Sequence, residues 1–244
     1  MAVIHKVTLT PSKLELLASW LPKQPWYLGK GPQPELTKAG GFRLDDPQGD
    51  VGMEFMVVTD TSGDQPLVYH VPLSYRGAPL DGADHALVGT TEHEVLGRRW
   101  IYDGTHDPVL VAQLFALIKG DAEPQAQNVS NSPDLSVTGY FAETGHTAAI
   151  GSTVVANGAD GTDLLVETTA ASESRSQSGS QSRSTRQLSI RVNRILRPSQ
   201  DGLSTDATRS RGHVTADWLL PDGTKARGLF AVVRNDAADP TTSE

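Results

Sequence analysis

The stretch Glu54–Tyr75 reads EFMVVTDTSGDQPLVYHVPLSY and holds two strand patterns around one turn. Residues 54–59 are rich in apolar and β-branched side chains, and residues 61–64 (TSGD) are typical turn formers. In residues 67–75 successive side chains divide between two faces, as they do in a strand. Two strands joined by so short a turn predict an antiparallel meander. Pro72 has no N–H to donate, so we expect the second strand to lie at a sheet edge or to contain a bulge.

Two helix patterns flank this meander. Ser12 and Glu15 fit a capping box, and apolar residues then recur at helical spacing as far as Pro22. Asp107 is a good N-cap for a second, largely apolar helix, which Gly120 ends. The remaining strand patterns predict strands at 2–9, 85–91 and 98–102 in the first half and, in the second half, at 137–141, 147–155, 163–169, 188–196, 213–220 and 228–234.

Composition narrows the classes of function. The 244 residues include 21 basic and 29 acidic side chains, for a net charge of −8, and no Cys. The absence of Cys excludes disulfides, thiolate nucleophiles and Cys-based zinc sites. The sequence has no run of about 18 apolar residues and no signal-peptide pattern, so we expect a cytoplasmic protein with no membrane partner. The acidic balance makes a nucleic-acid partner unexpected.

The composition changes after residue 120. The second half has ten Arg and one Lys, and it is nearly all strand and turn in pattern. Arg191 lies in a predicted strand, where we expect cross-strand pairing with Asp163 or Glu167. We therefore expect units at 1–120 and 136–236 joined by a linker at 121–135, a disordered Ser-rich insertion at 172–186, and a disordered tail at 237–244.

Several runs in the first half resemble one known family. They are Thr8–Leu17 (TLTPSKLELL), Val71–Leu80 (VPLSYRGAPL), Gly89–His93 (GTTEH) and Leu96–Gly104 (LGRRWIYDG). Together they resemble the N-terminal cap of maltokinases and related aminosugar kinases, over roughly residues 1–120. The resemblance implies an α+β fold, in which a cystatin-like cap of curved antiparallel sheet wraps on a helix, followed by a mainly β second unit.

The same resemblance bears on activity. In the full-length kinases the cap precedes an intermediate lobe and a helical lobe with the catalytic and magnesium-binding acids, and this chain is too short for the latter. It also has no phosphate-binding loop or kinase-type catalytic motif. Residues 151–155 and 187–196 faintly resemble the intermediate lobe, with Arg191 at the position of the ATP-contacting Lys, which Arg does not replace. We expect no enzyme activity, no cofactor and no metal site.

Two classes of binding function remain. The first is a non-catalytic binding or regulatory protein that associates with an enzyme of trehalose, maltose or glycogen metabolism. The second is a carbohydrate- or small-ligand-binding protein that uses the aromatic side chains of the cap, although aromatic residues there often fill a core instead. Residues 92–94 and 106–107 form a metal site only if their loops converge, and their spacing matches no tight metal motif. The candidate ligand or partner surface consists of Trp26, Tyr27, Arg76, His93, Arg99 and Trp100.

Overall fold

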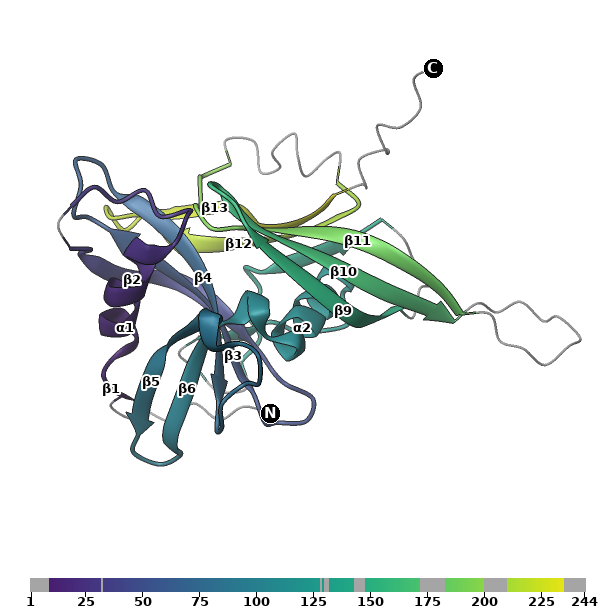
Figure 1. Cartoon of the computed structure of the whole chain (residues 1–244). Coiled ribbons are helices and arrows are strands. Elements are labelled where there is room, and N and C mark those ends of the chain that lie inside the picture. The colour runs from purple at the N-terminus through teal and green to yellow at the C-terminus, as the bar shows by residue number, and fades with distance from the viewer. Residues whose placement is uncertain are drawn as a thin grey trace, which may run out of the picture.

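The computed structural model describes residues 9–31, 33–127, 129, 132–142, 148–171, 183–199 and 210–234. Within them the protein is mostly antiparallel sheet with few helices (Figure 1). The helices are α1 (Lys13–Trp20), α2 (Pro108–Lys119) and the short 3-10 helices η1 (Leu21–Lys23), η2 (Asp84–Ala86) and η3 (Gly104–His106). The strands are β1 (Leu9–Thr10), β2 (Leu36–Leu44), β3 (Gly52–Asp60), β4 (Leu67–Arg76), β5 (Leu87–His93), β6 (Gly97–Asp103), β7 (Gln125–Ala126), β8 (Thr138–Phe141), β9 (Ala148–Asn157), β10 (Gly161–Ala171), β11 (Arg183–Asn193), β12 (Gly212–Leu219) and β13 (Lys225–Arg234).

All these strands belong to one sheet. Their order is β1-β5-β6-β4-β3-β2-β12-β13-β11-β10-β9, with β7 beside β2 and β8 beside β12. The sheet is strongly bent, so that α2 lies between the group β2–β6 and the group β9–β11 (Figure 1). The predicted antiparallel meander is confirmed, since β3 and β4 pair without a register shift from Gly52↔Tyr75 to Asp60↔Leu67.

The two faces of β3 pack against different helices. Phe55 and Val57 belong to the core around α2, whereas Met56 and Val58 belong to a second core that includes Leu17 of α1. Alternation along the strand produces this division, because successive side chains point to opposite faces. The two helices therefore cover opposite faces of the sheet.

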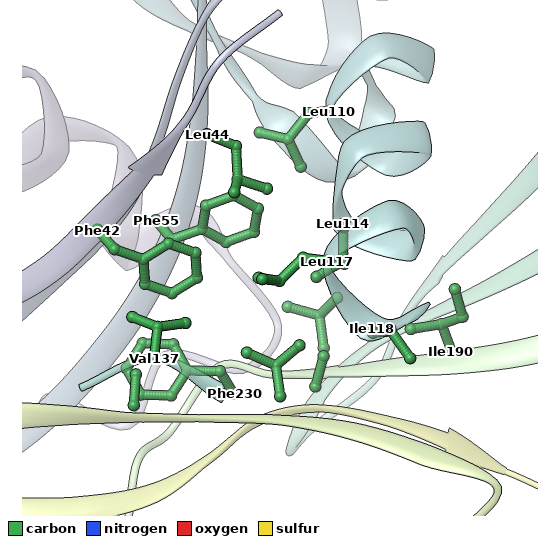
Figure 2. Close-up of a cluster of buried hydrophobic side chains, with 14 of the residues drawn as sticks. Phe42, Leu44, Phe55, Leu110, Leu114, Leu117, Ile118, Val137, Ile190 and Phe230 are labelled. Carbon is green, nitrogen blue, oxygen red and sulfur yellow. The ribbon is translucent and has the colours of Figure 1, made fainter. Parts of the chain in front are cut away.

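The larger core joins both halves of the sequence (Figure 2). Phe42 and Phe55 stack with ring centroids 4.6 Å apart, and Phe230 of β13 lies 5.9 Å from Phe42. Leu114 of α2 packs into the same cluster as Ile190 of β11. The change of composition near 121–135 does not interrupt this core, and the boundary between units placed there stays a prediction.

Strand β2 was not predicted from the sequence. It contains Gly40 and Gly41, both with positive φ, and its pairing with β3 shifts register between Lys38 and Gly40. A Cβ on Gly41 would lie 2.1 Å from the carbonyl oxygen of Phe55, and one on Gly40 would lie 3.3 Å from the Cα of Trp218. The glycines thus allow a bulge and the close approach of β12, a usual role of Gly inside a strand.

The expectation for Pro72 is wrong, because β4 lies between β3 and β6 and has no bulge against β3. The N–H of His70 points away from β3 and donates to the Arg194 carbonyl, so the nitrogen of Pro72, two residues on, points the same way. Pairing with β6 begins only at Leu73. Pro72 therefore occupies an inner strand at a point where no ladder hydrogen bond is needed.

Both predicted helices are confirmed with their caps. Ser12 and Glu15 form the capping box of α1, and the side chain of Asp107 accepts from the N–H of Val109 at the start of α2. Gly120 ends α2 in the left-handed conformation. The strand expected at 2–9 lies almost wholly outside the described residues, apart from Leu9 in β1.

The Ser-rich insertion is shorter than predicted. Strand β11 begins at Arg183 and pairs with β10 from Ala171↔Arg183 onward, so residues 183–186 belong to the sheet. Residues 172–182 and the predicted tail at 237–244 lie outside the described residues. Their disorder stays a prediction.

Candidate functional site

A buried ion pair joins the two halves of the chain. Arg194, which follows β11, places Nη2 2.6 Å from Oδ2 of Asp103 at the end of β6. Its Nε donates to Oγ1 of Thr162 at 2.8 Å, and Nη2 also reaches Oγ1 of Thr105 at 3.0 Å. Burial raises the pKa of the Asp103 carboxyl, but Arg194, Thr105 and His106 together hold that pKa below its ordinary value. The side chain of Arg194 is thus bonded to residues of both halves of the chain and holds them together.

Trp26 lies directly against this pair. The guanidinium of Arg194 lies 4.8 Å over the Trp26 ring, whose other neighbours are Trp20 at 5.7 Å and Tyr69 at 6.1 Å. Trp26 is fully buried, which differs from the surface position expected for it. Tyr27, its neighbour, is half-buried, stacks on Tyr69 at 5.4 Å and donates from its hydroxyl to Asp60.

A second buried carboxylate is Glu54 on the α1 face of β3. It accepts from Nζ of Lys13, from the hydroxyl of Tyr75 at 2.7 Å and from Nε2 of Gln127 at 3.0 Å. Burial raises the pKa of Glu54, but Lys13 and Tyr75 together hold it below its ordinary value. Glu54 is therefore a charged anchor for α1, and its oxygens are already occupied.

Arg76 is likewise paired. Its Nε and Nη2 donate to the two carboxylate oxygens of Asp107, each at 2.7 Å, in the bidentate geometry that Arg favours. Asp107 is also the N-cap of α2, so Arg76 fixes the end of β4 to the start of that helix. Trp100 is the cross-strand neighbour of Arg76 on β6 and is half-buried.

The other two candidates lie on the opposite face of the same strands. Arg99 is adjacent to Trp100 on β6 and therefore points to the α1 side, as does His93 of β5, which pairs with Gly97. The six candidate residues are thus not one surface. They form three places: Trp26 with Tyr27 near the start of β4, Arg76 with Trp100 near its end, and His93 with Arg99 at the β5–β6 hairpin.

The hairpin turn between β5 and β6 is held rigidly by polar side chains. Nδ1 of His93 accepts from the N–H groups of Val95 at 3.2 Å and Leu96 at 3.1 Å. Nη2 of Arg99 donates to the carbonyl of Leu96 at 2.9 Å. The side chains of Val95 and Leu96 nevertheless point to solvent, with 60% and 47% exposed. We call His93, Val95, Leu96 and Arg99 the hairpin tip.

Sequence reasoning missed Arg194 and the exposed pair at the hairpin tip. The expected pairing of Arg191 with Asp163 is confirmed, with Nη1 2.8 Å from Oδ2. No local pattern marks Arg194, whose partner Asp103 is far away in the sequence. The signal that could have found the hairpin tip is the pair of consecutive apolar residues, Val95 and Leu96, in a turn.

The comparisons with known proteins agree with the resemblance drawn from the sequence. Residues 20–107, from the end of α1 to the N-cap of α2, match a family model. They are similar to the maltokinase N-terminal cap domain. This cap-like region is less than half of the chain and contains the hairpin tip, Arg76 and Asp103. No curated protein shows a significant match to the chain.

Two kinds of feature are absent from the described residues. In that part of the chain no three His, Asp or Glu side chains are grouped so that they could hold a metal ion together. No helix among the same residues is long and apolar enough to cross a membrane. The buried carboxylates Glu54, Asp103 and Asp107 are instead engaged in the ion pairs described above.

Proposed function

We propose that the protein is a non-catalytic binding or regulatory module, in which the cap-like region presents the hairpin tip to a protein partner. The resemblance to a maltokinase cap supports an enzyme of trehalose, maltose or glycogen metabolism as that partner. As part of this proposal, the cap-like region is cystatin-like, with the sheet β1–β6 packed on α1.

The observation that carries the proposal is the exposure of Val95 and Leu96 on a turn that side-chain hydrogen bonds hold in place. Apolar side chains on a mobile loop lose conformational entropy when they bind, and this cost is reduced when the turn is already fixed. His93 and Arg99 fix this turn through three hydrogen bonds to its backbone. An exposed apolar pair with charged side chains around it matches the apolar centre and polar rim of a protein interface.

The surroundings of the hairpin tip support a charged rim. Arg98 and Glu92 form an exposed ion pair at 2.9 Å on the same hairpin, on the face opposite to Arg99. Such an exposed pair contributes little to stability. It is available to set the orientation of a partner, because rim charges act mainly on specificity and association rate.

The engagement of the buried carboxylates supports a non-catalytic role. Asp103 is bound by Arg194, Asp107 by Arg76 and Glu54 by Lys13 and Tyr75. A general acid or base has to reach a substrate proton within about 3 Å, and these groups face partners inside the protein. Their perturbed pKa values therefore follow from structural ion pairs.

The test is quantitative co-purification with the intact chain from the cells that encode it. The variant V95S/L96S removes the apolar pair, and V154S removes a similarly exposed side chain, 63% exposed, on β9 at the other end of the sheet. The proposal expects a carbohydrate-active enzyme to be recovered with the wild type and with V154S and to be lost with V95S/L96S. Because all three residues are exposed, the variants should stay folded, and circular dichroism of each variant checks this.

A second candidate function is carbohydrate binding at Trp100. Trp20, Trp26 and Trp218 are buried, and Trp100 alone of the four tryptophans is half-buried. Aromatic rings are common platforms for sugar rings, and Arg76 stands beside Trp100 on the next strand. If this candidate holds, titration with maltose, trehalose or glycogen should change the Trp fluorescence of the protein, and W100F should abolish that change. Flat titrations up to about 10 mM, a binding free energy weaker than about −3 kcal/mol, would remove this candidate.

A further inference from the structure

Two histidines that are distant in the sequence meet beside the cap-like sheet. Nε2 of His85, in η2, lies 3.1 Å from Nδ1 of His106, in η3. Their ring centroids are 4.7 Å apart, and the ring planes are nearly perpendicular, at 85°. His85 is exposed and His106 is half-buried, so the pair lies at the surface with one edge open to solvent.

The spacing of the two nitrogens fits a shared metal ion. Zinc–imidazole bonds are about 2.0–2.1 Å long. Two such bonds separate their nitrogens by about 2.9 Å at a right angle and by about 3.4 Å at the tetrahedral angle. The observed 3.1 Å between His85 Nε2 and His106 Nδ1 lies between these values. The same two atoms can therefore share one hydrogen bond in the apo protein or, once the shared proton has moved to the other nitrogen of its ring, one metal ion in the bound protein.

We propose that His85 Nε2 and His106 Nδ1 bind one divalent transition-metal ion of the zinc, copper and nickel group. Imidazole nitrogen is a preferred ligand of these ions, whereas calcium and magnesium prefer oxygen. The described residues offer no third His, Asp or Glu grouped with this pair, so the remaining positions of the ion are taken by water. The site therefore has two protein ligands and open coordination positions on its solvent side.

The ion would add a link between two segments of the cap-like region. His85 lies in the connection between β4 and β5, and His106 lies directly before Asp107, the N-cap of α2. A ligand that binds only the folded chain stabilises it. Binding is therefore expected to raise the midpoint of thermal unfolding as well as to occupy the two nitrogens.

The test uses the full chain with any affinity tag removed, titrated with zinc chloride by isothermal calorimetry. The proposal expects one zinc per chain, a higher unfolding midpoint with zinc, and loss of both effects in H85A and in H106A. H213A is the matched control, because His213 lies on β12 in the second half and outside the pair. Imidazole ¹⁵N spectra add a readout that does not depend on stability, since Cu²⁺ should broaden His85 Nε2 and His106 Nδ1 and leave His213 unchanged.

Two results overturn the proposal. One is the absence of zinc binding by the wild type, which leaves the pair as a hydrogen bond between two imidazoles. The other is zinc binding that H85A retains at wild-type affinity, which places the ion elsewhere. H85A is decisive here because His85 is exposed and its loss should not affect folding.

Discussion

Arg194 Nη2 lies 2.6 Å from Asp103 Oδ2, and both side chains are buried where the two halves of the chain meet. Asp103 ends β6 in the cap-like region, and Arg194 follows β11 in the second half. Next to them, the N–H of His70 donates to the carbonyl of Arg194. The cap-like region is thus joined to the second half by a charged pair and by a continuous sheet.

Removal of Arg194 is expected to destabilise the fold strongly. The variant R194A leaves Asp103 buried without its charge partner, and breaking a buried ion pair in this way costs about 3–5 kcal/mol. The free energy of unfolding in urea measures the loss. R191A is the control, because Arg191 pairs with Asp163 at a partly exposed site and its removal should cost less than about 1 kcal/mol. Equal losses in the two variants would show that the buried pair has no special role.

His70 should make stability depend on pH between 6.5 and about 3. Burial lowers its pKa to about 3, so the folded protein keeps His70 neutral while the unfolded chain takes up a proton below 6.5. Stability is therefore full above pH 6.5 and falls as the pH decreases, by at most about 1.4 kcal/mol per pH unit for this one group. Nδ1 of His70 donates to the Asn193 carbonyl at 3.0 Å, which fixes the neutral tautomer.

The matching experiment compares the wild type with H70Q in urea at pH 7, 6 and 5. The variant loses packing at every pH but has no titrating group at position 70. The difference between the two free energies of unfolding should therefore narrow as the pH falls. His106 and His213, whose pKa values are also lowered by burial, are present in both proteins and cancel in the difference. A constant difference would mean that His70 titrates alike in the folded and unfolded states.

Gly139 of β8 should not tolerate a side chain. A Cβ at this position would lie 1.9 Å from the carbonyl oxygen of Leu117, which belongs to α2. G139A is therefore expected to lower the free energy of unfolding by about 1–3 kcal/mol, as overpacking does. G151A on β9 is the control. A Cβ there would lie 3.7 Å from its nearest neighbour, the backbone carbonyl oxygen of Glu167, which is an ordinary van der Waals distance. If G139A and G151A lowered the free energy of unfolding equally, β8 would not pack on α2 as described.

The Ser-rich insertion should be dispensable. Ala171 and Arg183 are opposite each other at the paired ends of β10 and β11, so a short Gly-Ser turn can connect them. Replacing residues 172–182 by such a turn should change the free energy of unfolding by less than about 1 kcal/mol, because loop-closure entropy varies slowly with length. A loss of several kcal/mol in urea would show that the insertion packs against the folded chain.

The elements that could be predicted from sequence are those with local signals. Asp107 and Gly120 carry their capping chemistry in their own side chains and backbone, so the bounds of α2 were predictable. Strand β2 could not be predicted in the same way, since Gly40 and Gly41 lower strand propensity and act only through β12 and β3. Long-range packing therefore decided β2, whose pairing with β12 helps to join the two halves.

For the candidate site as well, the sequence showed local properties and not the long-range packing. The sequence marked His93, Arg99 and Trp100 by residue type, but strand alternation placed Arg99 and Trp100 on opposite faces of β6. The aromatic character of Trp26 predicted a binding platform, whereas Arg194 and Trp20 enclose it in the structure. Residue type alone did not show which side chains are exposed.

The most direct measurement of the central claim is the amount of partner recovered with the intact chain and with V95S/L96S, determined by quantitative mass spectrometry. The account predicts that an enzyme acting on trehalose, maltose or glycogen co-purifies with the wild type and with V154S, and that its recovery falls at least about tenfold with V95S/L96S, a change of about 1.4 kcal/mol or more in binding free energy. Recovery of no such enzyme, or equal recovery with all three proteins, would contradict it.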